Sequence, residues 1–126
     1  MNVVDSSGWL EYFADTAYAD VFMEPIEDLP NLIVPVICLT EVFKRVLQQR
    51  TEQDALQAVA YMQQGLIINL TPDLAIYAAK LGHDQKLPLA DSLIWATTQA
   101  FDAILWTQDV HFKGFEKVRY FSKSGP

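Results

Sequence analysis

The apolar residues of the chain follow two kinds of repeat. Four or five short runs rich in β-branched and aliphatic residues predict strands, and longer segments with apolar residues at helical spacing separate them. In VICLTEVFKRVLQQ, for example, Val36, Leu39, Phe43, Val46 and Leu47 fall at helical spacing. The predicted strands are residues 1–5, 31–35, 66–70, 103–107 and 118–121, and the predicted helices are residues 6–14, 16–24, 36–49, 55–64, 71–82 and 90–100.

Residues typical of helix ends flank several of these segments. The serines that open SSGWLEYFA are available to cap the first helix. Thr51 with Asp54 resembles a capping box before the helix ALQAVAYMQQ. Thr71 and Pro72 are typical of a helix start, and we expect Gly82 to terminate that helix.

Strands that alternate with helices predict parallel pairing through right-handed crossovers. We therefore expect an α/β fold, with a mostly parallel central sheet covered by helices on both faces. The chain has 126 residues and no internal repeat or flexible linker, which predicts one domain over residues 1–126 with a loose tail at 122–126.

Composition and charge narrow the functional classes. The net charge is −7, which argues against broad electrostatic binding to nucleic acid but not against an enzyme that holds a phosphodiester through metal ions. Lys44, Arg45 and Arg50 are grouped on one predicted helix, and we interpret them as a solvated face. Cys38 is the only cysteine, and its apolar neighbours predict a core position. The chain carries no leader-like or membrane-spanning segment, so we expect a soluble cytoplasmic protein with no membrane partner.

Acidic residues stand at positions where an α/β sheet binds ligands. Asp5 ends one predicted strand and Asp109 lies just past another, and ligands of such sheets bind beyond the carboxyl ends of the strands. If the two strands are neighbours, two carboxylates about 4 Å apart repel by roughly 4 kcal/mol at an effective dielectric near 20. Asp91 and Glu41 each interrupt an apolar helical stretch. Such a cluster needs protons or a hard cation such as Mg²⁺ or Mn²⁺.

Each acid also has a structural explanation. Asp5 could cap the helix that follows it, and Asp91 lies near a helix N-terminus, where the macrodipole stabilises a carboxylate by about 0.3–1 kcal/mol. Glu41 could pair with a basic residue of its own helix, and Asp109 could be a turn residue. Asp102 falls in a turn between helix and strand, where we expect it to be solvated and outside any site.

Four sequence blocks resemble the PIN domain, and specifically the VapC toxin ribonucleases of bacterial and archaeal toxin–antitoxin pairs. The blocks are VVDSSGWLEYF, LTEVFKRV, LPLADSLIWATTQ and AILWTQDVHF, and the resemblance extends from Met1 to about Phe121. It implies a three-layer α/β/α sandwich that hydrolyses RNA phosphodiester bonds with one or two Mg²⁺ or Mn²⁺ ions.

The resemblance also implies the residues of the site. The acids that it identifies as both catalytic and metal-binding are Asp5, Glu41, Asp91 and Asp109. Ser6 and Thr107 match positions that commonly support the acids by hydrogen bonding. Further implied partners are an RNA substrate, a cognate antitoxin that covers the acidic groove, and a second copy of the chain.

The chain departs from the family pattern after TQD. Many relatives carry a second acid there, whereas Val110, His111 and Phe112 follow in this chain. His111 could contact phosphate, but we favour a partly exposed structural histidine. His83 is predicted to be a solvent-facing loop residue. The missing acid puts the occupancy of a second ion in doubt.

Other functions fit the sequence less well. The alternative is a PIN-fold module that binds a partner and has weak or lost nuclease activity, although retention of four acids argues against it. The five glycines are too scattered for a dinucleotide or phosphate-binding loop, and a receiver domain would need a second acid beside Asp5. Phe22, Met23, Phe43 and Val46 could offer apolar surface to an antitoxin, but we favour a core role for Phe43 and Val46. Trp9, Trp95 and Trp106 are predicted core residues.

Overall fold

A five-stranded sheet forms the centre of the protein in a computed structural model that describes residues 1–124. All four strand pairs are parallel, and the strand order is β3-β2-β1-β4-β5. The strands are β1 (Asn2–Val4), β2 (Leu32–Pro35), β3 (Leu66–Ile68), β4 (Ile104–Thr107) and β5 (Val118–Tyr120). The predicted α/β class is confirmed, and β1 occupies the centre of the sheet.

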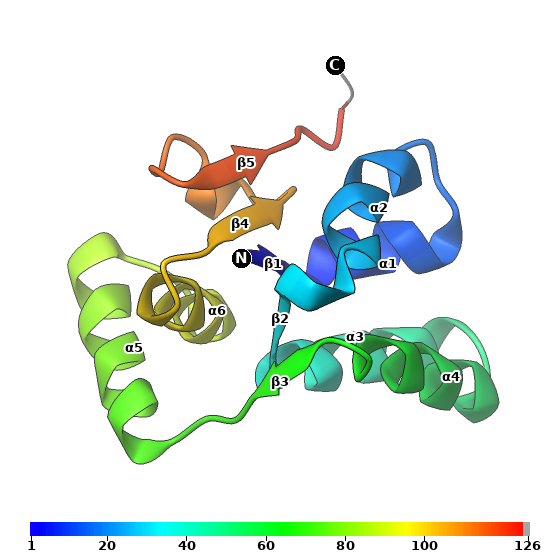
Figure 1. The fold of residues 1–126 in the computed structure, drawn as a ribbon, viewed down its shortest axis with the longest axis horizontal. Helices are drawn as coiled ribbons and strands as arrows, with labels where there is room; N and C mark the ends of the chain where they lie inside the picture. Colours follow the sequence, from blue (N-terminus) through cyan, green and yellow to red (C-terminus); the bar gives the residue numbers. More distant parts are fainter. Residues whose placement is uncertain (125–126) are drawn as a thin grey trace.

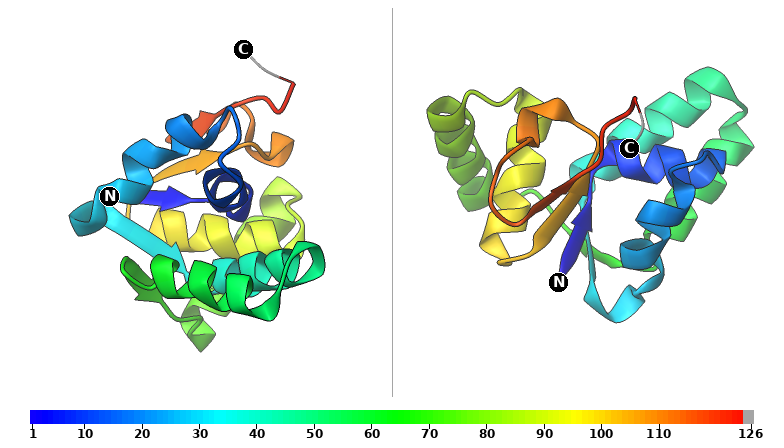
Figure 2. Two further views of the ribbon diagram at one scale, coloured as in Figure 1. Left: turned by 90° about the vertical axis from the view of Figure 1, so that its right-hand side faces the viewer. Right: turned by 90° about the horizontal axis from the view of Figure 1, so that it is seen from above.

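Helices cover both faces of this sheet. Helices α1 and α2 lie on one face and α5 and α6 on the other, while α3 and α4 pack against each other (Figures 1 and 2). The helices are α1 (Ser6–Ala14), α2 (Ala19–Glu27), α3 (Val36–Gln49), α4 (Glu52–Met62), α5 (Pro72–Gln85) and α6 (Leu89–Ala100), with two short 3-10 helices, η1 (Leu29–Asn31) and η2 (Val110–Phe112). Within residues 1–124, no helix combines the length and the apolar character needed to cross a bilayer.

The core lies between the sheet and its helices. Trp9, Trp95 and Trp106 are all buried, as the pattern predicts. Cys38 is also fully buried, and burial raises the pKa of its thiol. Phe22 is buried as well, so the expectation that it could offer surface to a partner is wrong, whereas Met23 is exposed. The sheet is therefore held from both sides by large aromatic side chains.

Side-chain caps mark the start of three of the six α-helices. Thr51 accepts a hydrogen bond from the backbone N–H of Asp54 at 3.1 Å, and Thr71 accepts one from Leu74 at 3.2 Å, as expected for N-caps. Of the caps that the sequence offers for the first helix, Asp5 is used and the serines are not. The second helix begins three residues later than predicted and ends at Glu27.

The end of α5 also differs from the prediction. This helix continues past Gly82 to Gln85, and Lys86 ends it with a left-handed backbone at φ 58°. Gly82 is required for another reason, because a Cβ atom there would collide with Oγ of Ser92 on α6. His83 is exposed as predicted but lies in this helix and not in a loop. The tail predicted for residues 122–126 falls partly outside the described residues, which end at 124.

Candidate functional site

The carboxyl ends of β1 and β4 meet at the centre of the sheet. Val4 pairs with Trp106, and the backbone N–H of Asp5 donates to the Trp106 carbonyl at 2.9 Å. Asp5 therefore emerges from the sheet beside Thr107, the last residue of β4, and Asp109 follows two residues later. This is the edge at which parallel sheets bind ligands.

The carboxylate of Asp5 is buried among hydrogen-bond donors. It accepts from the Ser6 backbone N–H at 2.8 Å, from Ser7 Oγ at 3.0 Å and from Thr107 Oγ1 at 2.7 Å. Burial raises the pKa of Asp5 and has the largest effect, although the hydrogen bonds from Thr107 and Ser7 lower it. The charges of Asp109 and Glu41 add to the effect of burial, so the pKa is raised to about 6. Asp5 both caps α1 and faces the other acids, so its structural and functional explanations hold together.

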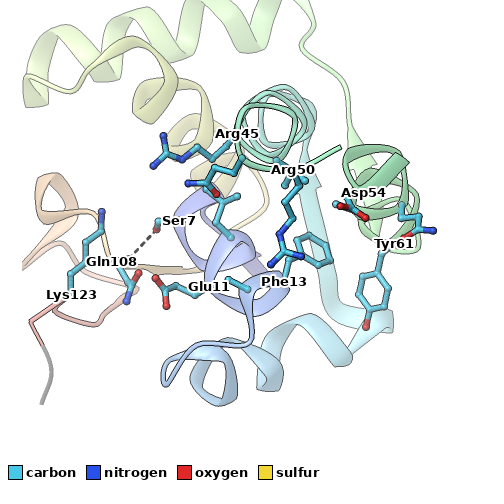
Figure 3. A pocket seen from close by; sticks show the side chains of 15 residues that line it. Ser7, Glu11, Phe13, Arg45, Arg50, Asp54, Tyr61, Gln108 and Lys123 are labelled. Carbon is cyan, nitrogen blue, oxygen red and sulfur yellow. Dashed lines mark hydrogen bonds between the residues drawn. The ribbon is translucent and has the colours of Figure 1, made fainter. Parts of the chain in front are cut away.

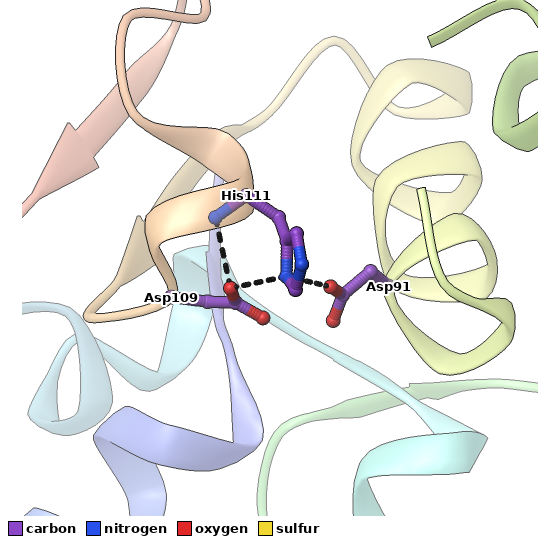
Figure 4. Close-up of side chains that lie close together, drawn as sticks. All are labelled: Asp91, Asp109 and His111. Atoms are coloured by element: carbon purple, nitrogen blue, oxygen red, sulfur yellow. Dashed lines mark hydrogen bonds and ion pairs between the residues drawn. The ribbon is translucent and has the colours of Figure 1, made fainter. Parts of the chain in front are cut away.

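Asp91 and Asp109 approach each other across the edge of the sheet, with His111 between them (Figure 4). Asp91 comes from the first turn of α6, and Asp109 immediately precedes η2. Nδ1 of His111 lies 3.0 Å from Oδ2 of Asp91 and 2.7 Å from Oδ1 of Asp109. Ligating atoms of these three residues all lie within 4.8 Å of one another.

The pKa values of Asp91 and Asp109 are shifted in opposite directions. Burial raises the pKa of Asp91 to about 7, and the neighbouring Asp109 carboxylate raises it as well. Burial also opposes ionisation of Asp109, but hydrogen bonds from the His111 backbone and from Asp91, with the nearby imidazole, lower its pKa overall. One proton shared between the two carboxyl groups accounts for both pKa shifts.

Glu41 joins the site from α3 through a serine. Ser6 Oγ donates to Oε1 of Glu41 at 2.7 Å, and the Glu41 charge contributes to the raised pKa of Asp5. Thr107 also accepts the backbone N–H of Asp109 at 2.8 Å, so its hydroxyl links two acids. Hydrogen bonds and charge contacts thus link all the residues predicted for the site, including the supporting residues Ser6 and Thr107. Among the described residues, three or more metal-ligating side chains with ligand atoms within 4.8 Å of one another are found only in Asp91, Asp109 and His111.

Asp102 lies outside this group. Its side chain is 82% exposed and pairs with Lys117, and the hydrogen bond from Lys117 lowers the pKa of Asp102. The prediction of a solvated aspartate in the turn before β4 is confirmed.

Two polar residues at the site, Ser7 and Gln108, were not predicted from the sequence, and His111 was expected to be a partly exposed structural histidine. Ser7 donates to Asp5 and accepts the backbone N–H of Gln108 at 3.3 Å, and His111 contacts two acids. Gln108 is 3% exposed, and neither polar atom of its side chain has a hydrogen-bond partner. The position of Gln108 between Thr107 and Asp109 is the signal that could have identified it.

A cleft of about 700 Å³ adjoins the acidic group on the side of α1, α3 and α4 (Figure 3). Ser7 and Gln108 line its end nearest the acids. The basic residues that line it are Arg45, Arg50 and Lys123. Arg45 and Arg50 were interpreted as part of a solvated face. Both are exposed, as that interpretation expects, and both also line this cleft.

The sequence model of the PIN domain matches residues 3–118. The chain belongs to the PIN domain family. No protein of curated description matches this PIN domain in sequence.

Solved structures share the fold of this PIN domain. A chain of a toxin–antitoxin complex from Klebsiella pneumoniae is 24% identical, with a TM-score of 0.81 over 97% of this chain and 99% of the other. VapC20 of Mycobacterium tuberculosis, described as a sarcin–ricin loop cleaving toxin, is 20% identical, with a TM-score of 0.76 over 94% and 99%. VapBC2 of Rickettsia felis, bound to a promoter DNA fragment, is 15% identical, with a TM-score of 0.74 over 96% and 97%.

The residues of this PIN domain fit the divalent metal ion that PIN nucleases use. The four acids are Asp5, Glu41, Asp91 and Asp109, and within residues 1–124 no lysine or arginine forms an ion pair with any of them. Oxygen donors of this kind suit a hard divalent cation. Burial, with the neighbouring carboxylates, raises the pKa of Asp5 and Asp91, and a cation bound beside them would favour their ionised forms.

Proposed function

We propose that this PIN domain is a metal-dependent endoribonuclease that acts as the toxin of a toxin–antitoxin pair. The observation that carries the proposal is the convergence of four acids, from β1, α3, α6 and the end of β4, at one edge of the sheet. Similar folds described as toxin–antitoxin proteins, one of them a sarcin–ricin loop cleaving toxin, support it.

The proposed metal ligands and catalytic residues are Asp5, Glu41, Asp91 and Asp109. A divalent ion held there, Mg²⁺ or Mn²⁺, supplies Lewis-acid chemistry that lowers the pKa of a bound water and stabilises charge on the leaving oxygen of the phosphodiester. Thr107 holds the carboxylate of Asp5 and the backbone of Asp109 in place. Ser6 holds the carboxylate of Glu41.

The cleft beside the acids supports RNA as the substrate. Arg45, Arg50 and Lys123 offer cationic groups for phosphates next to the site, although the chain as a whole carries a net charge of −7. Phosphates on either side of the scissile bond could therefore be held while the bond lies over the acids.

The proposed partner is a small antitoxin protein. The acidic group and the cleft lie side by side, so a segment with basic and apolar side chains could cover both and block the substrate. Purification of the chain together with the product of a neighbouring gene tests this partner, and co-expression without a detectable complex would count against it. Pairing of two copies of the chain also remains a prediction.

Cleavage of total cellular RNA tests the nuclease directly. The purified chain and its Asp91→Asn variant are compared with Mg²⁺, with Mn²⁺ and with a chelator. We expect metal-dependent cleavage by the wild type that the chelator stops and the variant lacks. Equal, absent or chelator-insensitive cleavage would reject the catalytic proposal and favour a partner-binding module.

A further inference from the structure

His111 is held against the acidic group by its own backbone. Its N–H donates to Oδ1 of Asp109 at 2.9 Å, and this bond caps η2. The turn directs the imidazole back over Asp109 and toward Asp91 on α6 (Figure 4). The side chain is 49% exposed, so part of the ring remains in contact with solvent.

The spacing of the three residues matches the coordination shell of a metal ion. Adjacent ligands of an octahedral ion with bonds of about 2.1 Å lie about 3 Å apart. Nδ1 of His111 lies 2.7 Å from one carboxylate oxygen and 3.0 Å from the other. A structural histidine needs a single acceptor, whereas this nitrogen faces two carboxylates from separate elements.

The chemistry of the nitrogen changes which ion is preferred. Mg²⁺ takes oxygen ligands and keeps several waters, whereas imidazole is a common ligand of transition metals. A site of two aspartates and one histidine therefore favours a transition-metal ion over Mg²⁺ more than a site of carboxylates alone. The four acids on which the proposed function rests do not by themselves give this preference for a transition-metal ion.

We infer that His111 is a direct metal ligand, which gives Nδ1 to an ion shared with Asp91 and Asp109 and shifts the preference of the site from Mg²⁺ toward Mn²⁺. The inference rests on the proposed metal centre. It adds a ligand that the acidic residues do not include.

Pulsed electron paramagnetic resonance of bound Mn²⁺ tests this ligand, because it detects the hyperfine coupling of a directly bonded ¹⁴N nucleus. The chain has two histidines, so His83→Gln, an exposed position on α5, is the matched control. We expect ¹⁴N coupling in the wild type and in His83→Gln, and its loss in His111→Gln. His111→Asp, which restores an oxygen ligand, should bind Mn²⁺ without the nitrogen signal.

Titration calorimetry with Mn²⁺ and with Mg²⁺ measures the preference. His111→Gln should weaken Mn²⁺ binding by about 10-fold or more, a larger factor than for Mg²⁺, and thermal unfolding in chelator verifies that each variant is folded.

The outcomes separate this inference from the proposed function. Mn²⁺ that binds and supports RNA cleavage without ¹⁴N coupling, or with coupling that persists in His111→Gln, overturns the histidine ligand and leaves the nuclease intact. A wild type that binds neither ion overturns the metal centre and this inference together.

Discussion

Hydroxyl groups orient the acids of this site at the scale of single residues. Thr107 donates to Asp5 and accepts from the backbone of Asp109, while Ser6 and Ser7 donate to Glu41 and Asp5. A hydrogen bond to a carboxylate fixes which oxygen faces the metal, and loss of such an outer-shell partner typically costs 10- to 100-fold in metal affinity or activity. The hydroxyls are therefore part of the site.

Replacement of Thr107 tests this role. Thr107→Val keeps the shape of the side chain but removes both hydrogen bonds, so we expect RNA cleavage to fall by about 10- to 100-fold. Thr98→Val is the control, because Thr98 is also buried but bonds only to the Ile94 carbonyl within α6. Equal losses in the two variants would contradict an orienting role, and Thr107→Ser should recover most of the activity.

The pH dependence of stability follows from the buried acids. The pKa of Asp5 is about 6 and that of Asp91 about 7 in the folded protein, both above the ordinary value of 3.8. Because the folded state binds these protons more tightly than the unfolded state, protonation stabilises the fold. This contribution to the free energy of unfolding is fully present below pH 3.8 and is lost as the pH rises through 6 to 7. For Asp5 alone, the free energy of unfolding at low pH and at high pH differs by about 3 kcal/mol.

Thermal unfolding in chelator measures this effect. The metal-free protein should unfold at a lower temperature at pH 8 than at pH 5, and Asp5→Asn should reduce the difference. Mn²⁺ should stabilise the wild type most at pH 8, where it does not compete with protons. A melting temperature that rises from pH 5 to pH 8 in chelator would contradict the assignment of these pKa values.

At the scale of elements, features set within one segment could be predicted from the sequence, whereas the contacts that Gly82 and His111 make with other segments could not. The strand runs, the threonine caps and the position of Asp5 and Asp109 after two strands are local, and these predictions are confirmed. The role of Gly82 depends on how closely α5 packs against α6, which cannot be predicted from either segment alone. The contact of His111 with Asp91 similarly depends on how η2 faces α6.

Gly82→Ala tests the packing of α5 on α6. The added methyl group would collide with Ser92, so we expect a loss of about 1–3 kcal/mol in the free energy of unfolding, despite the higher helix propensity of alanine. His83→Ala, at an exposed position of the same helix, should change it by less than about 0.5 kcal/mol. Chemical denaturation measures both. A more stable Gly82→Ala variant would show that the helices can separate without cost.

At the scale of the whole molecule, the charge is unevenly placed. The net charge of −7 argues against broad electrostatic binding to nucleic acid, and the grouped Arg45 and Arg50 were interpreted as a solvated face. Both arginines are exposed, as that interpretation expects, and both also line the cleft. Composition gives the total charge, but only the fold places α3 next to the carboxyl end of β1.

Salt dependence of RNA binding tests this arrangement. Arg50→Gln should weaken the binding of a single-stranded RNA, measured without cleavage in chelator, and reduce the slope of log affinity against log salt by about 0.7. Lys44→Gln is the matched control, because Lys44 is exposed on the same helix but does not line the cleft. Identical slopes for both variants and the wild type would place the RNA elsewhere.

The measurement that tests the central claim most directly is the rate of RNA cleavage with Mn²⁺ in five variants. Four of them change the proposed ligands, Asp5→Asn, Glu41→Gln, Asp91→Asn and Asp109→Asn. The fifth, Asp102→Asn, changes the solvated aspartate outside the site. We predict a loss of more than about 100-fold in each of the four, and wild-type cleavage in the fifth. Activity that survives in the four, or that is lost equally in Asp102→Asn, would contradict a single metal centre built from these acids.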